Sequence, residues 1–265
     1  MRKYCILFLS LFFLVACDDF LSVKPKAEIV EHVYFDTPEG FEDALYGAYS
    51  TLSASALYGE HLSWGLLDVF AQYYKKNSIN DNVKSMLILE HEKLRSYYNL
   101  IWNKGYETIG YVNNVLRNLE RKSENSMHYY KLYKGEALGL RAYLHFDLLR
   151  LFAPRYEGNE NKDGIILKKR VELDFLPRSS VKECVTEIRT LLNEARNVDN
   201  TQKNVYWLSD KAVAYLQVEL ELYAGNYPAV LELTKDLETE YPESVLGADV
   251  YKYLWSSENS DARIF

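Results

Sequence analysis

Two neighbouring stretches of the chain have the apolar patterns of long α-helices. Within residues 93–121 the inward positions recur every three or four residues, at Leu94, Tyr98, Ile101, Gly105, Ile109, Val112, Leu116 and Leu119. This spacing predicts one long amphipathic helix. Residues 127–152 are apolar around most of a helical circumference, with only Glu136, Asp147 and Arg150 as a polar stripe, which predicts a helix enclosed by neighbours. The polar segment between them is short, so we expect an antiparallel hairpin.

Further helices are predicted by caps and shorter apolar faces. Thr37-Pro38 supplies a capping hydroxyl and a proline for the first turn of a helix. Its expected inner face consists of Phe41, Leu45, Ala48 and Leu52. Either Ser179 or Ser180 is expected to cap a helix over 181–196, with Val185, Ile188, Leu192 and Ala195 inside. These segments extend the helical pattern to both sides of the long pair.

Two more helices are predicted near residue 225. Ser209 precedes the first, and Gly225 supplies a left-handed stop after it. Pro228 lies in the first turn of the second, whose inner face would hold Val230, Leu233 and Leu237. The phrase LYAGNYPAVLEL at this bend resembles the turn of a tetratricopeptide repeat. We therefore predict a mainly α fold, an array of degenerate tetratricopeptide-like helical hairpins.

Two segments lack a clean period and are expected to be long irregular loops. Residues 53–91 mix small, aromatic and polar types, with a short helix predicted over about 66–73. Residues 153–178 are predicted to be a polar loop around a possible strand at 165–167. Long excursions in compact domains are often functional.

The amino terminus has the pattern of a bacterial lipoprotein. Arg2 and Lys3 precede an apolar run that is too short to span a membrane, which is typical of a secretory signal. The sequence Leu14-Val15-Ala16-Cys17 resembles a lipobox. From this resemblance we expect residues 1–16 to be the signal peptide and Cys17 to carry lipid. Several acyl chains on one cysteine would make a stable membrane anchor.

Charge and cysteine content limit the partners and the chemistry. Losing Arg2 and Lys3 with the signal reduces 31 basic residues to 29 against 38 acidic ones, a net charge of −9. Such a charge argues against nucleic acid as a partner. Cys184 would be the remaining free cysteine, so no intramolecular disulfide is expected.

No pattern of catalytic or metal-binding residues stands out. The five histidines form no His-Glu-x-x-His, and there is no Cys-x-x-Cys, Gly-x-Ser-x-Gly or phosphate-binding glycine loop. His145 falls on an apolar helix face and is expected to be a hydrogen-bonded core histidine, and Cys184 a half-buried thiol. We predict no catalytic residues, no metal site, no cofactor and no enzyme activity.

Aromatic residues supply the positive signal. The chain holds 23 Tyr, 4 Trp and 11 Phe. Sugar rings present apolar C–H faces that stack on aromatic rings, while polar side chains bind the hydroxyls. Five of these residues are expected to serve in helix packing: Tyr98, Trp102, Tyr106, Tyr143 and Tyr223. The candidates for ligand binding lie in the irregular excursion: Trp64, Asp68, Tyr73 and Tyr74.

Five tracts in order resemble the SusD/RagB-type outer-membrane lipoproteins of Bacteroidetes. They are CDDFLSVKP, FDTPEGFEDALYGAYSTL, GEALGLRAYLHFDLLRLFA, LPRSSVKECVTEIRTLLNEA and LSDKAVAYLQVELELYAGNYPAVLELTKDL. The resemblance implies a SusD-like helical fold, a lipid anchor at the outer membrane and a partner in a SusC-type TonB-dependent transporter. It implies a protein that captures glycans or other nutrients for import. The alternative is a helical-repeat scaffold at the outer membrane that binds only proteins.

The resemblance also sets the expected division of the chain. Residues 17–36 would be a lipidated tether, and residues 37–265 the helical-repeat domain without its C-terminal part, because members of the family are about twice as long. Asp18 and Asp19 directly follow the lipid cysteine. In Bacteroidetes lipoproteins such acids resemble an export signal, so we expect the protein to face the cell exterior.

Overall fold

The computed structural model describes residues 31–73, 88, 90–122, 130–172, 175–196 and 207–240 of the chain. The chain divides into two compact units, Met1–Thr37 and Pro38–Phe265. The described part of the first unit holds the short helix α3 (Glu31–Tyr34). The rings of Tyr34 and Phe35 meet edge to face there, with centroids 5.2 Å apart.

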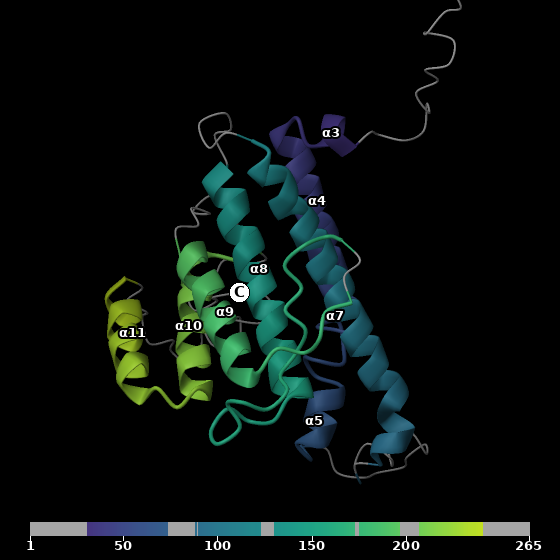
Figure 1. Cartoon of the computed structure of the whole chain (residues 1–265), viewed down its shortest axis with the longest axis vertical. Helices are drawn as coiled ribbons and strands as arrows, with labels where there is room; N and C mark the ends of the chain where they lie inside the picture. The colour runs from purple at the N-terminus through teal and green to yellow at the C-terminus, as the bar shows by residue number, and fades with distance from the viewer. Residues whose placement is uncertain are drawn as a thin grey trace, which may run out of the picture. The chain divides into compact units, whose positions relative to one another are not determined.

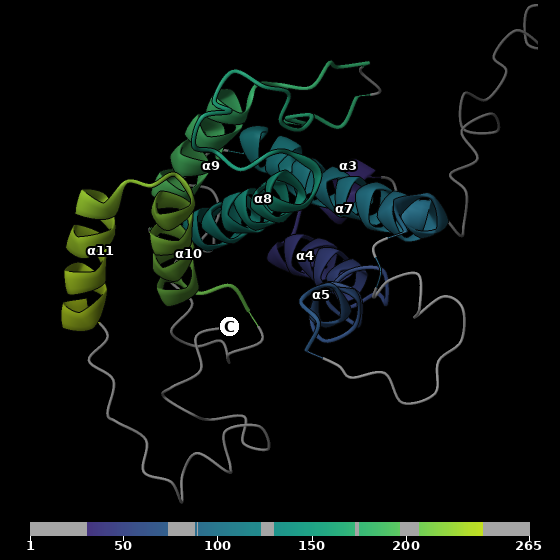
Figure 2. The same cartoon turned by 90° about the horizontal axis from the view of Figure 1, so that it is seen from below.

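The second unit is helical throughout its described core (Figure 1). Its helices are α4 (Pro38–Leu52), α5 (Leu66–Phe70), α7 (His91–Glu120), α8 (Tyr130–Phe152), α9 (Val181–Ala195), α10 (Asp210–Tyr223) and α11 (Tyr227–Glu240). Figures 1 and 2 both show α7, α8, α9, α10 and α11 following one another in space, with α4 against the long pair. The predicted mainly α architecture is confirmed.

Helix α8 lies at the centre of the second unit. It packs mainly against α7 and α9 and also contacts α4 and α10. Most of its residues are buried, so the predicted enclosed helix is confirmed. Of the predicted polar stripe, Arg150 is exposed, whereas Glu136 is 0% exposed and Asp147 is 9% exposed. The hydroxyl of Tyr49 donates a 2.7 Å hydrogen bond to Glu136, so the fold satisfies this polar group inside the core.

The long helix α7 presents the face that its periodicity predicts. The repeating positions from Leu94 to Leu119 are buried, except that Tyr98 is half-buried. The inner faces predicted for α4 and α9 are buried as well, including Phe41 and Leu45 on α4 and Val185 and Ile188 on α9. Burial of these faces supplies the main stabilising force, because each large apolar side chain removed from water contributes about 1.5–3 kcal/mol.

Helix ends follow the capping residues closely. Ser180, rather than Ser179, caps α9 in a capping box with Glu183. The Ser209 hydroxyl accepts a 3.0 Å hydrogen bond from the backbone of Ala212 at the start of α10. Gly225 adopts a φ of 71°, the left-handed conformation in which glycine avoids a steric penalty. These local signals therefore place the boundaries of α9, α10 and α11.

The two irregular segments are more closely attached to the helices than expected. Residues 53–65 form a series of turns that leads into α5, which confirms the short helix there. The Tyr58 ring stacks on Tyr143 of α8, with centroids 4.9 Å apart. In the later loop the expected strand at 165–167 is not formed, and the pairing is an isolated antiparallel bridge between Asp163 and Ser180.

Helix α11 is the least buried of the long helices. Val230, Leu233 and Leu237 are half-buried, whereas the prediction placed them on an inner face. Within the described residues α11 packs chiefly against α10. None of the described helices is both long enough and apolar enough to cross a membrane.

Candidate functional site

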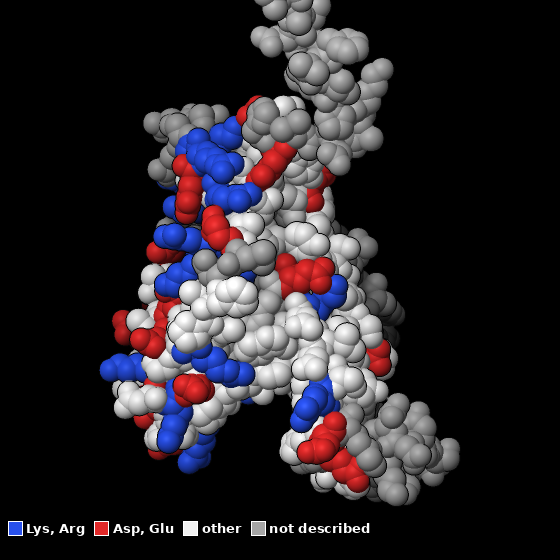
Figure 3. Space-filling model, turned by 45° about the vertical axis from the view of Figure 1, so that its right-hand side comes forward, with Lys and Arg blue, Asp and Glu red and all other residues white. Residues whose placement is uncertain are grey.

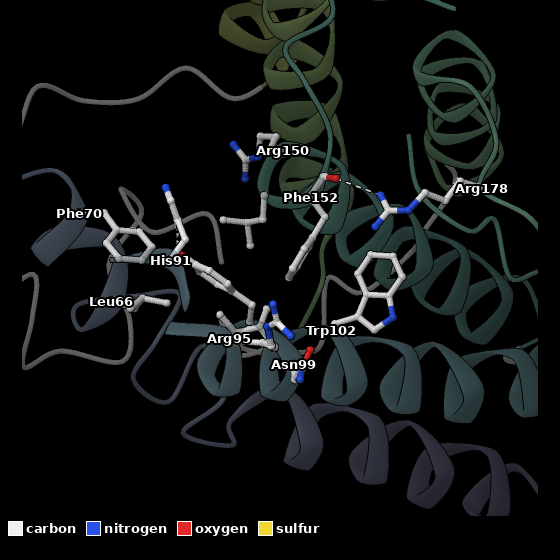
Figure 4. A pocket seen from close by; sticks show the side chains of 12 residues that line it. Leu66, Phe70, His91, Arg95, Asn99, Trp102, Arg150, Phe152 and Arg178 are labelled. Carbon is white, nitrogen blue, oxygen red and sulfur yellow. Dashed lines mark hydrogen bonds between the residues drawn. The ribbon is translucent and has the colours of Figure 1, made fainter. Parts of the chain in front are cut away.

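A pocket of about 650 Å³ opens beside the first half of α7. Its lining residues come from α5, α7, the end of α8 and the loop before α9, as Figure 4 shows: Leu66, Phe70, His91, Arg95, Tyr98, Asn99, Ile101, Trp102, Arg150, Leu151, Phe152 and Arg178. The volume falls within the range typical of small-molecule sites. In Figure 3 a notch at the lower edge of the second unit separates two lobes, and the surface above the notch is mostly uncharged.

One wall of the pocket is a stripe along α7. Arg95, Tyr98, Asn99 and Trp102 follow one another at helical spacing, next to the buried face that packs on α8. The Tyr98 hydroxyl lies 3.0 Å from Nδ1 of His91 at the start of the helix. Burial raises the pKa of Tyr98, so its phenol is protonated and neutral at physiological pH.

An aromatic and cationic cluster holds Trp102, the last residue of this stripe, in place. The rings of Trp102 and Phe152 meet edge to face with centroids 5.0 Å apart. The guanidinium of Arg178 lies 4.8 Å from the Trp102 ring centre and donates to the carbonyls of Phe152 at 3.0 Å and Gly164 at 2.6 Å. These contacts fix the indole ring before any ligand arrives, which reduces the entropy cost of binding.

Arg150 is held at the edge of the same pocket by acids. It forms an ion pair with Asp147 one turn earlier and lies 3.5 Å from a carboxylate oxygen of Glu219 on α10. Burial favours the neutral form of Arg150, but the Asp147 and Glu219 carboxylates outweigh it and raise the pKa. The guanidinium is therefore a permanent cation with a fixed position.

The chemistry of this lining is suited to binding. Aromatic faces from Phe70, Tyr98 and Trp102 offer stacking surfaces, while Arg95 and Asn99 offer hydrogen-bond donors. Figure 4 shows Phe70 and Leu66 on one side of the space and Phe152 and Trp102 on the other. A flat ligand with apolar faces and hydroxyl edges matches this arrangement.

The structure separates the predicted binding residues from this pocket. Trp64 is 60% exposed and Tyr73 is 79% exposed, and neither lines it. Asp68 on α5 is half-buried, and its neighbours Leu66 and Phe70 line the pocket. Tyr74, Cys17, Asp18 and Asp19 lie outside the residues that the structure describes.

The sequence predicts helix packing for two of the residues that line the pocket. Tyr98 and Trp102 are half-buried, and each contributes one part of its ring to packing and another to the pocket. Tyr106, Tyr143 and Tyr223 do pack between elements, with Tyr106 hydrogen-bonded to the carbonyl of Ile166 at 2.8 Å. The available signal was the run of aromatic residues at spacing four, Tyr98, Trp102 and Tyr106, on the border of the apolar face.

Two side chains of the core also differ from expectation. His145 is 0% exposed, but neither ring nitrogen has a hydrogen-bond partner among the described residues, contrary to the predicted hydrogen-bonded histidine. Cys184 is fully buried rather than half-buried, and burial raises the pKa of its thiol. Within the described part of the chain, no group of three His, Cys, Asp or Glu residues lies close enough to hold a metal ion.

Comparison with known proteins identifies the class of this helical array. Residues 19–219 match the SusD-like family described as starch-binding and associating with the outer membrane. The chain belongs to this SusD-like family. It is also similar to the SusD-like protein P38 of Formosa agariphila, with 24% identity over 84% of this chain and 42% of the relative.

Solved structures agree with the fold. A SusD superfamily protein of Bacteroides thetaiotaomicron matches with a TM-score of 0.69 at 19% identity, over 84% of this chain and 51% of the other. A SusD-like carbohydrate-binding protein of Bacteroides vulgatus matches with a TM-score of 0.62 at 17% identity, over 81% of this chain and 47% of the other. The chain thus spans about half the length of these relatives.

Proposed function

We propose that this chain is a cell-surface lipoprotein that binds glycan nutrients and delivers them to a SusC-type TonB-dependent outer-membrane transporter. The observation that carries the proposal is the match of residues 19–219 to a family described as starch-binding and associating with the outer membrane. Binding without chemical conversion is the activity proposed.

The pocket beside α7 supports the glycan-binding part of this proposal. We infer that a sugar ring stacks on Trp102, whose position Arg178 and Phe152 fix, and that Arg95 and Asn99 bind ring hydroxyls. Stacking on a preorganised aromatic ring tolerates several sugars, because each presents an apolar C–H face. This pocket would therefore supply affinity, and specificity would depend on the polar groups at its rim.

The excursion before α7 is proposed as a second contact area for the same ligand. Trp64 and Tyr73 present large exposed aromatic surfaces, and Asp68 lies between them in the sequence. Tyr74 completes this set of candidates. A polysaccharide is longer than one pocket. The exposed aromatic rings of Trp64 and Tyr73, which flank α5 in the sequence, would therefore add stacking sites for further sugar units.

Substitution of Trp102 tests the pocket. We expect Trp102→Ala to weaken binding of the chain to soluble starch or to a maltooligosaccharide by about tenfold, because it removes the central stacking surface. Affinity electrophoresis and calorimetric titration measure this effect. Trp64→Ala and Tyr73→Ala, tested separately, are expected to weaken retention on long polysaccharide more than binding of a short oligosaccharide.

Tyr111→Ala is the matched control for Trp102→Ala. Tyr111 also lies on α7 and is 47% exposed, but it does not line the pocket. Equal losses in the two variants would contradict a site at Trp102. If a panel of glycans is not bound while charge reversals on helix faces disrupt a complex with the β-barrel transporter, the scaffold alternative is favoured.

Surface display rests on the amino-terminal sequence. We propose that Cys17 carries the lipid, that residues 17–36 form the tether to the domain at 37–265, and that Asp18 and Asp19 direct export. Protease added to intact cells is expected to degrade the wild-type protein and to spare an Asp18→Ala, Asp19→Ala double variant. Protection of both proteins from protease would refute the outward orientation.

A further inference from the structure

A second pocket, of about 440 Å³, lies at the other end of α7. It is lined by the last turns of α7, by Arg141 of α8 and by the segment 169–172 that crosses them. Trp102 lines the first pocket and Arg117 lines the second, and they are 15 residues apart on α7. At the rise of an α-helix this spacing corresponds to about 22 Å. The two spaces are distinct sites.

Cations dominate the lining of this second pocket. Four basic and two acidic residues line it: Arg117, Arg141, Lys169, Arg170, Glu120 and Glu172. Glu120 and Glu172 are exposed. Lys169 is paired with Glu187 outside the pocket at 2.5 Å. Figure 3 shows basic side chains interleaved with acidic ones near the end of the unit where α7 ends and α8 begins. A positive pocket is unexpected in a chain with a net charge of −7.

Arg141 is the unusual member of the set. It is only 9% exposed, and within the described part of the chain it forms no ion pair. One terminal nitrogen donates to Asn113 Oδ1 at 3.0 Å and to the Lys169 carbonyl at 3.4 Å. Its Nε is buried without a hydrogen-bond partner among the described residues. Burial lowers the pKa of Arg141, and the carboxylates of Glu187, Glu194 and Glu120 offset this only in part.

A buried charge without a counter-ion is costly, and proteins normally pair it. The neutral contacts of Arg141 hold the segment 168–170 against α7, helped by Asn113, which donates to the carbonyls of Lys168 at 3.0 Å and Arg170 at 3.3 Å. This clamp explains the position of the guanidinium. It does not explain the use of a charged group, because the contacts made are to neutral oxygens.

We propose that this pocket binds a small ligand through an oxyanion group, a carboxylate or a sulfate, with Arg141 at its base and Arg170 at its rim. Guanidinium groups match both oxyanions in geometry and charge. The volume exceeds that of a bare ion and admits a sugar-sized body. The anion site stands by itself, whereas an acidic sugar as its ligand rests on the proposed glycan-binding function.

Calorimetric titration at constant ionic strength tests the proposal, with sodium sulfate, glucuronate and glucose as the probes. We expect saturable binding of one sulfate or one glucuronate and no competition by glucose. Arg170→Gln, an exposed position, is expected to weaken glucuronate binding about tenfold by removing one charge-assisted contact. Arg155→Gln is the matched control, because Arg155 is exposed and does not line the pocket.

The titrations of the two surface variants decide whether the anion site exists. Loss of binding in Arg170→Gln with little change in Arg155→Gln supports the site, whether or not an Arg141→Gln variant folds. Absence of saturable anion binding, equal losses in the two surface variants, or glucose binding as tight as glucuronate binding overturns it. Trp102→Ala is expected to leave sulfate binding intact, so failure of the starch experiment and failure of this one are distinguishable.

Discussion

Acidification from pH 6.5 to pH 3 is expected to reduce the free energy of unfolding by about 4 kcal/mol through His145 alone. Its burial, together with the charges of Arg141 and Lys169, lowers the pKa of His145 from 6.5 to about 3. Above pH 6.5 the residue is neutral in both states and contributes no pH dependence. As the pH falls below 6.5, His145 becomes protonated in the unfolded chain but stays neutral in the folded chain. The free energy of unfolding therefore falls until about pH 3.

Denaturant unfolding at a series of pH values measures this effect. In a His145→Leu variant the slope of unfolding free energy against pH should be smaller by one proton between pH 6 and pH 4, about 1.4 kcal/mol per pH unit. Carboxylates contribute equally to both proteins and cancel in the difference. Identical slopes in the two proteins would show that His145 takes up its proton in the folded state.

Replacing Asp147 with alanine is expected to cost about 3 kcal/mol of stability. Asp147 is 9% exposed, accepts a 2.5 Å hydrogen bond from the Tyr58 hydroxyl and pairs with Arg150. Burial and the Asp147 carboxylate raise the pKa of Tyr58 well above its usual value, so the phenol is a donor at any physiological pH. The variant leaves that hydroxyl without its acceptor and removes the closer of two acids beside Arg150.

Glu219→Ala provides the matched control for Asp147→Ala. It removes the other acid beside Arg150, at 3.5 Å and in a partly exposed position, so the expected loss is below about 1 kcal/mol. Urea unfolding followed by circular dichroism compares the two variants. Similar losses would mean that Asp147 acts only through its charge on Arg150, and that the Tyr58 hydrogen bond contributes little.

The helices were predictable because their causes are local. A spacing of three and four residues places Leu94 and Leu119 on the same face of α7 whatever lies opposite, and the hydroxyl of Ser209 caps α10 within its own first turn. Gly225 ends its helix through its own backbone conformation. Errors arose where a residue depends on a partner distant in sequence.

The candidate site was harder to predict for that reason. The irregular segment before α7 makes Trp64 and Tyr73 the candidates in the sequence, yet the pocket is formed where Trp102 meets Phe152 and Arg178 from two later segments. Periodicity assigns Trp102 to the border of a packed face and gives no indication that the neighbouring helix ends beside it. A pocket is a space left between elements, so no single segment encodes it.

The sequence by itself determined the helices, their caps and the membership of the family, since each depends on residues close together or on their order. The tertiary structure alone decided which polar residues are buried and how they are satisfied. Glu136 meets Tyr49 from 87 residues away, and Asp147 meets Tyr58 from 89 residues away. Arg141 has no such ion-pair partner in the described part of the chain, which is why its pocket is proposed to bind an anion. Helical periodicity fixes the face on which a residue lies, but only packing brings a second face to it and sets the local dielectric environment.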